Sequence, residues 1–256
     1  MLWYYYQTMK RILVIAAHPD DESFMAGGTI AKYEDDGWIV DVICATRGEE
    51  GGDADVRQKE LEKAGTALGV HAITFLGYRD GTLSGRTPGD IEEALYKKMA
   101  EIVPDVVITS DTSGISNHPD HVKLSYAATY AFQKYAKWIE EQLAPQEEAE
   151  QVFPKLYYAC LPETVVSHAV KNKILPAVSF GKPWRGVEDK KITTVIDISD
   201  YREIKERALR QHLTQAANVG RHIKMKDLMK HEYFIFRMYG TTEVFMGKND
   251  HVADSL

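Results

Sequence analysis

Four apolar runs dominate the first 142 residues, and each is followed by a segment whose apolar residues recur at helical spacing. Apolar runs with so few polar residues are typical of strands that are buried on both faces of a sheet. We therefore expect strands and helices in alternation. The expected strands span residues 10–17, 38–46, 72–76 and 105–110, and the expected helices span residues 22–36, 56–68, 91–103 and 119–142.

Four strand–helix pairs in succession predict an α/β fold, a Rossmann-like and mostly parallel sheet with helices on both faces. The second half is less regular. It contains expected strands at 156–161, 193–198 and 232–239 and an expected helix at 199–217. We expect residues 10–256 to form a single domain after a loose N-terminal extension over residues 1–9. Residues 163–189, rich in Pro, Gly and aromatic side chains, are expected to be an insertion that forms a substrate rim.

Composition narrows the class of protein. The formal net charge is −7, which argues against a general nucleic-acid binder because such proteins usually carry a basic surface. No stretch reaches the roughly 18 apolar residues that a membrane span needs. The two cysteines, Cys44 and Cys160, are far apart in the chain and make no disulfide framework. A reducing compartment, the cytoplasm, is therefore expected.

Two clusters of polar residues follow two of the expected strands. HPDDE, residues 18–22, comes directly after the first strand, and HPDH, residues 118–121, follows the fourth. In open parallel sheets, ligands bind beyond the carboxyl ends of the strands. If the two strands are neighbours, the clusters meet there. Either cluster alone is also compatible with a solvated turn or a helix start, whereas the pair is difficult to explain in that way.

The residue types in the two clusters are those of a metal site. His18 and Asp21, three residues apart, are candidates to bind one cation from a turn, and His121 is the candidate third ligand. Three protein ligands and one open position are typical of a catalytic zinc. Two nitrogens and one carboxylate also suit Fe²⁺, so the spacing leaves Zn²⁺ and Fe²⁺ as alternatives.

The remaining polar residues suit hydrolysis at such a cation. Asp20, next to the ligand Asp21, is a candidate general base for a metal-bound water. His118 is placed to stabilise an oxyanion or to protonate a leaving amine. Asp120 is expected to orient His118. Together these residues indicate metal-assisted hydrolysis of an amide.

AHPDDE after the first strand, with HPDH after the fourth, resembles the PIG-L/LmbE family of zinc-dependent de-N-acetylases, which act on N-acetylglucosaminyl compounds. The likeness runs from about residue 10 to residue 126 and, more weakly, to residue 215. It implies the same ligands and the same roles for Asp20 and His118 as the residue types do. In some thiol-pathway members a tyrosine stands two residues before HPDH, where this chain has Ser116.

The resemblance also implies residues that contact the substrate. Arg57 matches an arginine that contacts the sugar in the family. Glu49 lies in TRGEEGG, which is similar to a flexible acidic loop near the sugar. Asp80 in LGYRDG and His212 in HLTQ are the other two expected contacts.

The predicted function is therefore removal of an acetyl group from an N-acetylated amino sugar or its conjugate, with a small-molecule amino-sugar substrate as the partner. The alternative is a hydratase or lyase that acts on a small unsaturated diacid with the same metal site. A binding module with an inactive site is a third reading, which the complete ligand set disfavours. Members of the family are often oligomeric, so a homo-oligomer stays open.

Overall fold

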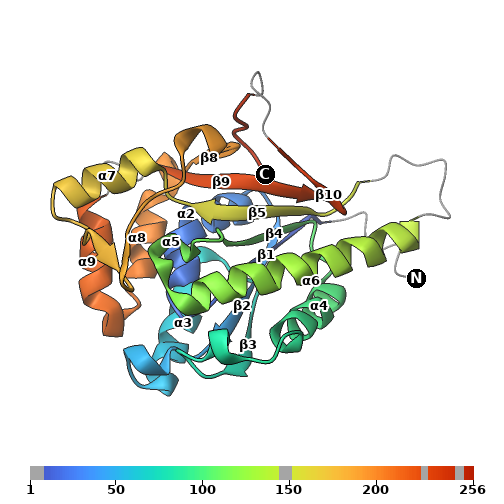
Figure 1. Ribbon diagram of the computed structural model, residues 1–256, viewed down its shortest axis with the longest axis horizontal. Coiled ribbons are helices and arrows are strands. Elements are labelled where there is room, and N and C mark those ends of the chain that lie inside the picture. The colour runs from blue at the N-terminus through green and yellow to red at the C-terminus, as the bar shows by residue number, and fades with distance from the viewer. Residues whose placement is uncertain (1–8, 144–151, 226–229, 246–250) are drawn as a thin grey trace.

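A single large sheet forms the centre of the molecule (Figure 1). The computed structural model describes residues 9–143, 152–225, 230–245 and 251–256. Five strands are mutually parallel in the order β3–β2–β1–β4–β5. Their bounds are β1 (Arg11–Ala16), β2 (Ile39–Thr46), β3 (Ala72–Tyr78), β4 (Val106–Ser110) and β5 (Lys155–Cys160). The predicted α/β class with a mostly parallel sheet is confirmed.

Antiparallel strands extend the sheet beyond β5. Strand β9 pairs with β5, and both β8 and β10 pair with β9. Their bounds are β8 (Thr194–Asp197), β9 (His231–Tyr239) and β10 (Thr242–Glu243). The less regular second half of the sequence thus completes the same sheet.

Successive residues of the strands pack on opposite faces, as the period of two in a strand requires. Ile12 and Val14 of β1 belong to the core beneath helices α2, α3 and α8, whereas Leu13 and Ile15 belong to the core beneath α4 and α6. The bounds of these helices are α2 (Asp21–Asp35), α3 (Ala54–Leu68), α4 (Asp90–Ile102), α6 (Pro119–Leu143) and α8 (Arg202–Leu209). Both faces of the parallel strands are therefore covered, which explains their continuous apolar sequences.

The order of the strands determines where a ligand can bind. β1 pairs with β2 on one side and with β4 on the other, so the chain reverses its direction of winding between β1 and β4. In such sheets the crevice for ligands lies beyond the carboxyl ends of the strands at this reversal. The loops that follow β1 and β4 carry HPDDE and HPDH, and this topology brings them together.

The expected helix over residues 199–217 is wrong. The chain instead forms α8, a turn at Leu213–Gln215, and then α9 (Ala216–Lys224). Thr214 in this turn donates its backbone N–H and its hydroxyl to Glu60 of α3, at 2.9 and 2.6 Å. These tertiary hydrogen bonds outweigh the modest helix propensity of the segment.

Residues 163–189 contain more regular structure than their composition indicates. They form helix α7 (Glu163–Lys171) and a hairpin of strands β6 (Val178–Ser179) and β7 (Lys182–Pro183). α7 packs through Val165 and Ala169 against Met225, which follows α9. In Figure 1, α7, α9 and the hairpin lie at one end of the sheet.

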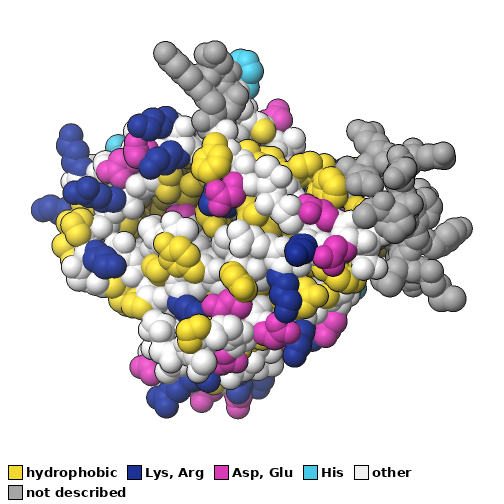
Figure 2. All heavy atoms as spheres, turned by 45° about the vertical axis from the view of Figure 1, so that its right-hand side comes forward, with side chains coloured by type: hydrophobic (Ala, Val, Ile, Leu, Met, Phe, Trp, Pro, Cys, Tyr) yellow, Lys and Arg dark blue, Asp and Glu magenta, His cyan; other side chains and the backbone are white. Residues whose placement is uncertain are grey.

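The described surface carries both signs of charge. On the face drawn in Figure 2, acidic and basic side chains are interspersed over the described atoms. Within the described ranges, no helix is both long and apolar enough to cross a membrane. Residues 1–8 of the expected N-terminal extension, and the segment 144–151, lie outside the described residues.

Gly28 in α2 makes a close contact that a side chain would obstruct. A Cβ atom there would lie 2.6–2.7 Å from three side-chain atoms of Ile198, whereas a Cβ at Gly27 would meet its nearest neighbour, Lys205 Cγ, at 3.2 Å. We predict that Gly28→Ala destabilises the protein by about 1–3 kcal/mol, the usual cost of overpacking.

Gly27→Ala is the matched control because it makes the same change one residue earlier in the same helix. We expect it to change the free energy of unfolding by less than about 1 kcal/mol, since the helix gains from alanine. Urea titration of both variants measures the difference. Equal stabilities would show that Ile198 moves aside freely.

Candidate metal and catalytic site

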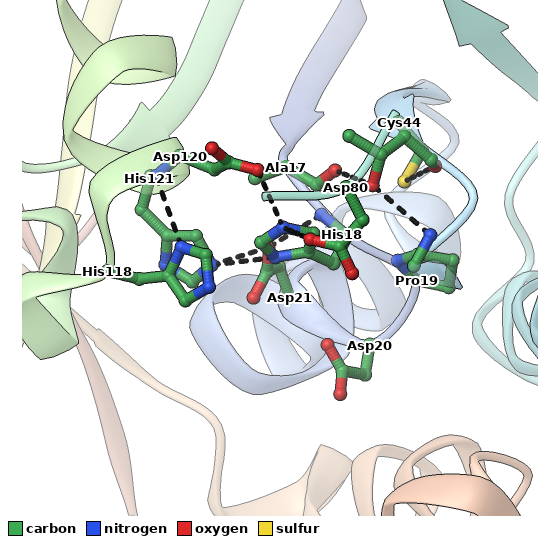
Figure 3. A network of polar contacts seen from close by, with 12 residues as sticks. Ala17, His18, Pro19, Asp20, Asp21, Cys44, Asp80, His118, Asp120 and His121 are labelled. Atoms are coloured by element: carbon green, nitrogen blue, oxygen red, sulfur yellow. Dashed lines mark hydrogen bonds and ion pairs between the residues drawn. The ribbon is translucent and has the colours of Figure 1, made fainter. Parts of the chain in front are cut away.

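Three side chains from the two loops converge at the end of β1 and β4 (Figure 3). His18 Nδ1 lies 3.0 Å from His121 Nε2. Asp21 Oδ2 lies 3.2 Å from the same His121 nitrogen and 3.6 Å from the same His18 nitrogen. Ligand atoms at about 2.0–2.1 Å from a tetrahedral zinc are separated by roughly 3.3 Å. The three atoms therefore have the spacing of one face of such a coordination sphere.

The outer nitrogens of the two imidazoles show why a cation belongs between them. His18 Nε2 lies 2.8 Å from Asp80 Oδ1, and His121 Nδ1 lies 3.1 Å from the carbonyl oxygen of Gly114. Both acceptors require an N–H donor, so each neutral ring carries its hydrogen on the outer side. The inner nitrogens then face each other with lone pairs at 3.0 Å. Either a proton or a metal ion must neutralise this repulsion, and the donor set fits a metal.

His118 lies beside this triad. A ring nitrogen of His118 is within 4.8 Å of ring nitrogens of His18 and His121, so these three histidines also form a possible ligand group. Asp21 is the better third ligand because its oxygen is in reach of both inner nitrogens and supplies negative charge. The structure thus contains a possible His/Asp metal site.

Asp120 does not orient His118 through its carboxylate, and that expectation needs correction. The carboxylate accepts hydrogen bonds from the backbone amides of Gly81 and Leu83, at 2.7 and 3.0 Å, and it lies 3.4 Å from His18 Nε2. The backbone N–H of Asp120 holds His118 instead, by donating to Nδ1 at 3.1 Å. Position 120 therefore supports two histidines, one through its side chain and the other through its amide.

His118 is held in its neutral form with its hydrogen on Nε2. Because Nδ1 accepts the Asp120 amide, the remaining N–H is on the other nitrogen. Burial, together with the neighbouring His121 and His18, lowers the pKa of His118 to about 4. Phe180 of the hairpin packs edge-on against this ring with centroids 4.4 Å apart. A neutral N–H donor is thus fixed beside the triad.

Asp20 is buried but does not take part in the triad. Figure 3 shows its carboxylate set apart from the imidazole cluster. Burial raises its pKa to about 7, with a further contribution from the charge of Asp21, while Arg57 at 3.4 Å acts in the opposite direction. Asp21 behaves differently: burial raises its pKa, but His121 and His18 outweigh burial and hold it well below the usual range. The two adjacent carboxyls therefore have different proton affinities, as a base and a ligand require.

Arg57 joins the loop after β1 to the loop after β2 beside the site. Nη1 donates to the carbonyl of Gly48 at 2.8 Å, and Nη2 donates to the carbonyl of Pro19 at 2.6 Å. The side chain lines the main cavity, as the predicted sugar contact requires. Both Nη atoms of Arg57 already donate to backbone carbonyls, so its contact with a sugar stays a prediction.

Of the other three predicted substrate contacts, only one lines the cavity. Asp80 lines the cavity and accepts from the Glu50 amide at 3.1 Å. The Glu49 carboxylate accepts from the Asp80 amide at 3.1 Å and does not line the cavity, whereas the neighbouring Glu50 does. His212 is 1% exposed and does not line the cavity. The expectations for Glu49 and His212 as sugar contacts are therefore corrected.

The cavity above the triad has a volume of about 530 Å³. One wall comes from the segment 163–189 and includes Leu175, Phe180 and Trp184. Trp184 Nε1 donates to the carbonyl of Ile115 at 2.8 Å, just before HPDH. The sequence showed the aromatic residues of this segment but not that two of them brace the loop after β4.

Comparisons with known proteins identify the family of this chain. A family model described as PIG-L, GlcNAc-PI de-N-acetylase, matches residues 13–132. A 1D-myo-inositol 2-acetamido-2-deoxy-alpha-D-glucopyranoside deacetylase of Rhodococcus erythropolis is 36% identical, over 80% of this chain and 81% of its own length. The chain belongs to the PIG-L family. A deacetylase of the same name from Catenulispora acidiphila is 32% identical over 80% of this chain and 75% of its own length.

Solved structures show the same fold. N,N'-diacetylchitobiose deacetylase from Pyrococcus horikoshii has a TM-score of 0.64 at 24% identity and covers 92% of this chain and 86% of that one. The 4-carboxy-2-hydroxymuconate hydratase from Pseudomonas putida also has a TM-score of 0.64, at 20% identity, and covers 93% of this chain and 100% of that one. The fold alone therefore does not separate deacetylase from hydratase, but the similar sequences carry deacetylase names. The predicted PIG-L/LmbE family and deacetylase class are confirmed.

Asp120 should contribute to stability as well as to the site. Its carboxylate is fully buried and accepts the buried Leu83 amide. We predict that Asp120→Ala lowers the free energy of unfolding by about 1–3 kcal/mol, because a buried amide loses its acceptor. Asp120→Asn keeps one acceptor oxygen and should cost less. Chemical denaturation measures both, and equal losses would show that the charge matters rather than the hydrogen bond.

Proposed function

We propose that the protein hydrolyses the acetamide of an N-acetylglucosaminyl conjugate, with Zn²⁺ bound by His18, Asp21 and His121. The observation that carries the proposal is the pair of inner imidazole nitrogens, 3.0 Å apart, with a carboxylate oxygen in reach of both. When bound, zinc supplies Lewis acidity to the acetyl carbonyl and to the attacking water. Fe²⁺ is the alternative metal because it accepts the same donor set.

The chain's own residues supply the proton transfers. Asp20, buried in the cavity wall and with a pKa near 7, accepts the proton of the attacking water. His118 Nε2–H donates to the carbonyl oxygen as negative charge develops there. Asp80 and Asp120 hold His18 by its outer nitrogen, so that the inner nitrogen faces the metal position.

The substrate class follows from the relatives and from the size of the cavity. The R. erythropolis and C. acidiphila relatives are named for an N-acetylated glucosaminyl-inositol. At about 530 Å³ the cavity is within the range of small-molecule sites. We assign the wall formed by residues 163–189 to recognition of the group attached to the sugar. Both cysteines are free and buried, as a cytoplasmic location would allow, and a homo-oligomer stays a proposal.

The test is release of primary amine by metal-loaded protein from a panel of N-acetylglucosaminyl compounds that includes N-acetylglucosaminyl-inositol and N,N'-diacetylchitobiose. We predict that Asp20→Asn lowers kcat by about 10²–10⁴, the usual contribution of a general base, while the bound metal is unchanged. Release that survives chelator, or is insensitive to this substitution, contradicts the proposal. Water addition to an unsaturated diacid without amine release would support the hydratase instead.

His118 and His121 form a matched pair at the start of α6, with His118 directly before the helix and His121 in its first turn. We predict that His118→Ala keeps the metal and lowers kcat by about 10²–10³, the usual effect of removing an oxyanion donor. His121→Ala should lose the metal itself. Metal content measured by elemental analysis, beside steady-state kinetics, separates the two roles. Metal loss in His118→Ala would make that histidine a ligand and contradict the assignment.

A further inference from the structure

We infer that Glu22 and His212 are positioning residues for Asp20: a buried pair that keeps its backbone in a strained conformation and its carboxylate in the cavity. The inference rests on the proposed function for the role of Asp20 as a base. The contact between Glu22 and His212, and its effect on the backbone of Asp20, can be tested by structure alone.

Asp20 has an unusual backbone. Its φ is 119° and its ψ is −30°, in a region that costs a residue other than glycine about 1–3 kcal/mol. Asp20 also stands at the N-cap of α2, where an aspartate normally folds its carboxylate back onto the first amides of the helix. No such bond forms here. The carboxylate lines the cavity instead, so other contacts must compensate for the strain.

Glu22 supplies one such contact. Its Oε2 accepts the backbone N–H of Asp20 at 3.1 Å, and its Oε1 accepts the hydroxyl of Ser23 at 2.5 Å. Glu22 is completely buried. It therefore satisfies the backbone N–H of Asp20 and ties this residue to the first turn of α2. A fully buried carboxylate needs a partner of its own, because burial of an unpaired charge is costly.

His212 is that partner. Its Nε2 lies 3.3 Å from Glu22 Oε1, and both side chains are 0% exposed. The contact is an ion pair rather than a well-aligned hydrogen bond, and the described residues offer neither ring nitrogen a hydrogen-bond partner. The pKa of His212 is raised: burial lowers it, but Glu22 and the nearby carboxylates outweigh burial.

The position of His212 connects this pair to the substrate side of the cavity. His212 directly precedes the turn that interrupts the expected helix, and Gln215 in that turn both lines the cavity and donates to the Gly51 carbonyl of the acidic loop at 2.9 Å. Thr214 fastens the same turn to Glu60 of α3. The conformation of Asp20 thus depends on a segment almost 200 residues away that also contacts the loop over the site.

A second buried ion pair, between α8 and β9, contacts α2 and provides the control. Lys205 Nζ lies 2.6 Å from Glu232 Oε1, and Glu232 accepts the amides of Gly28 and Thr29. This pair stabilises the same helix as Glu22 and His212 do. Within the described part of the chain, neither of its side chains forms a hydrogen bond or ion pair with Asp20. Lys205 Nζ also donates to the Phe24 carbonyl at 2.9 Å. Lys205→Met therefore loosens α2 while it keeps both partners of the Glu22–Asp20 and Glu22–His212 contacts.

The experiment compares His212→Leu, Glu22→Leu and Glu22→Gln with Lys205→Met in the metal-loaded protein. We expect His212→Leu and Glu22→Leu to lower kcat about ten- to hundredfold, the effect of a misplaced catalytic group, with unchanged metal content and little change in KM. Glu22→Gln keeps an oxygen for the Asp20 amide and should retain most of the activity. Lys205→Met should leave kcat unchanged. An unchanged kcat in His212→Leu, or an equal loss in Lys205→Met, overturns the inference.

Crystal structures of the wild type, His212→Leu and Glu22→Leu decide the geometry without any assay. We expect Asp20 to leave the positive-φ region in both variants and its carboxylate to turn back onto α2. A positive φ retained in both overturns the inference. If the wild type releases no amine, the proposed function fails while this readout still decides the pair. Should His212→Leu not fold, Glu22→Leu alone decides both measurements, because it removes the acceptor of the Asp20 amide and leaves no buried carboxylate.

Discussion

The site depends on the repulsion between two inner nitrogens of His18 and His121. Each ring is fixed from behind by an acceptor, Asp80 for one and the Gly114 carbonyl for the other, so neither ring can turn its hydrogen inward without losing a bond. The fold brings these two nitrogens to 3.0 Å, a distance that is favourable when a proton or a metal ion lies between them. Asp21 and the carboxylates behind His18 supply the negative charge that attracts it. The surrounding groups thus hold both rings in the orientation that a cation between them would require.

The division of labour between Asp20 and Asp21 follows from their surroundings. The two carboxyls are adjacent in the sequence, and both are enclosed by protein. Asp21 faces two imidazoles, which stabilise its charge, whereas Asp20 faces one arginine at 3.4 Å that is largely occupied by backbone carbonyls. Neighbouring charges rather than burial therefore distinguish the proposed ligand from the proposed base. The positive φ of Asp20 contributes too, because it sends the two side chains in different directions.

The sequence predicted the features of this site that depend on local patterns, and it missed those that depend on contacts between distant parts of the chain. The alternation of apolar runs and helical segments is local, and it correctly predicted the parallel strands and the loops that bear HPDDE and HPDH. The meeting of these loops required β1 and β4 to be neighbours, which the sequence offered only as a condition. The predictions for Glu49, Asp120 and His212 were wrong because the partners of these side chains come from other parts of the chain. Glu49 accepts the Asp80 amide, and Asp120 accepts the amides of Gly81 and Leu83. His212 pairs with Glu22. The helix expected over 199–217 failed for the same reason, since Thr214 bonds to Glu60 of α3.

Residues 163–189 show how one scaffold can accommodate different substrates. The fold is shared with a hydratase of very different substrate, so specificity must lie in what surrounds the metal position rather than in the sheet. Here the hairpin contacts the site at two points: Phe180 packs on His118, and Trp184 bonds to Ile115. The residues to which we assign substrate recognition therefore also brace the loop that bears His118, the proposed oxyanion donor. A change in this hairpin would alter which substrate enters and how well His118 is held, and the two properties would be expected to change together.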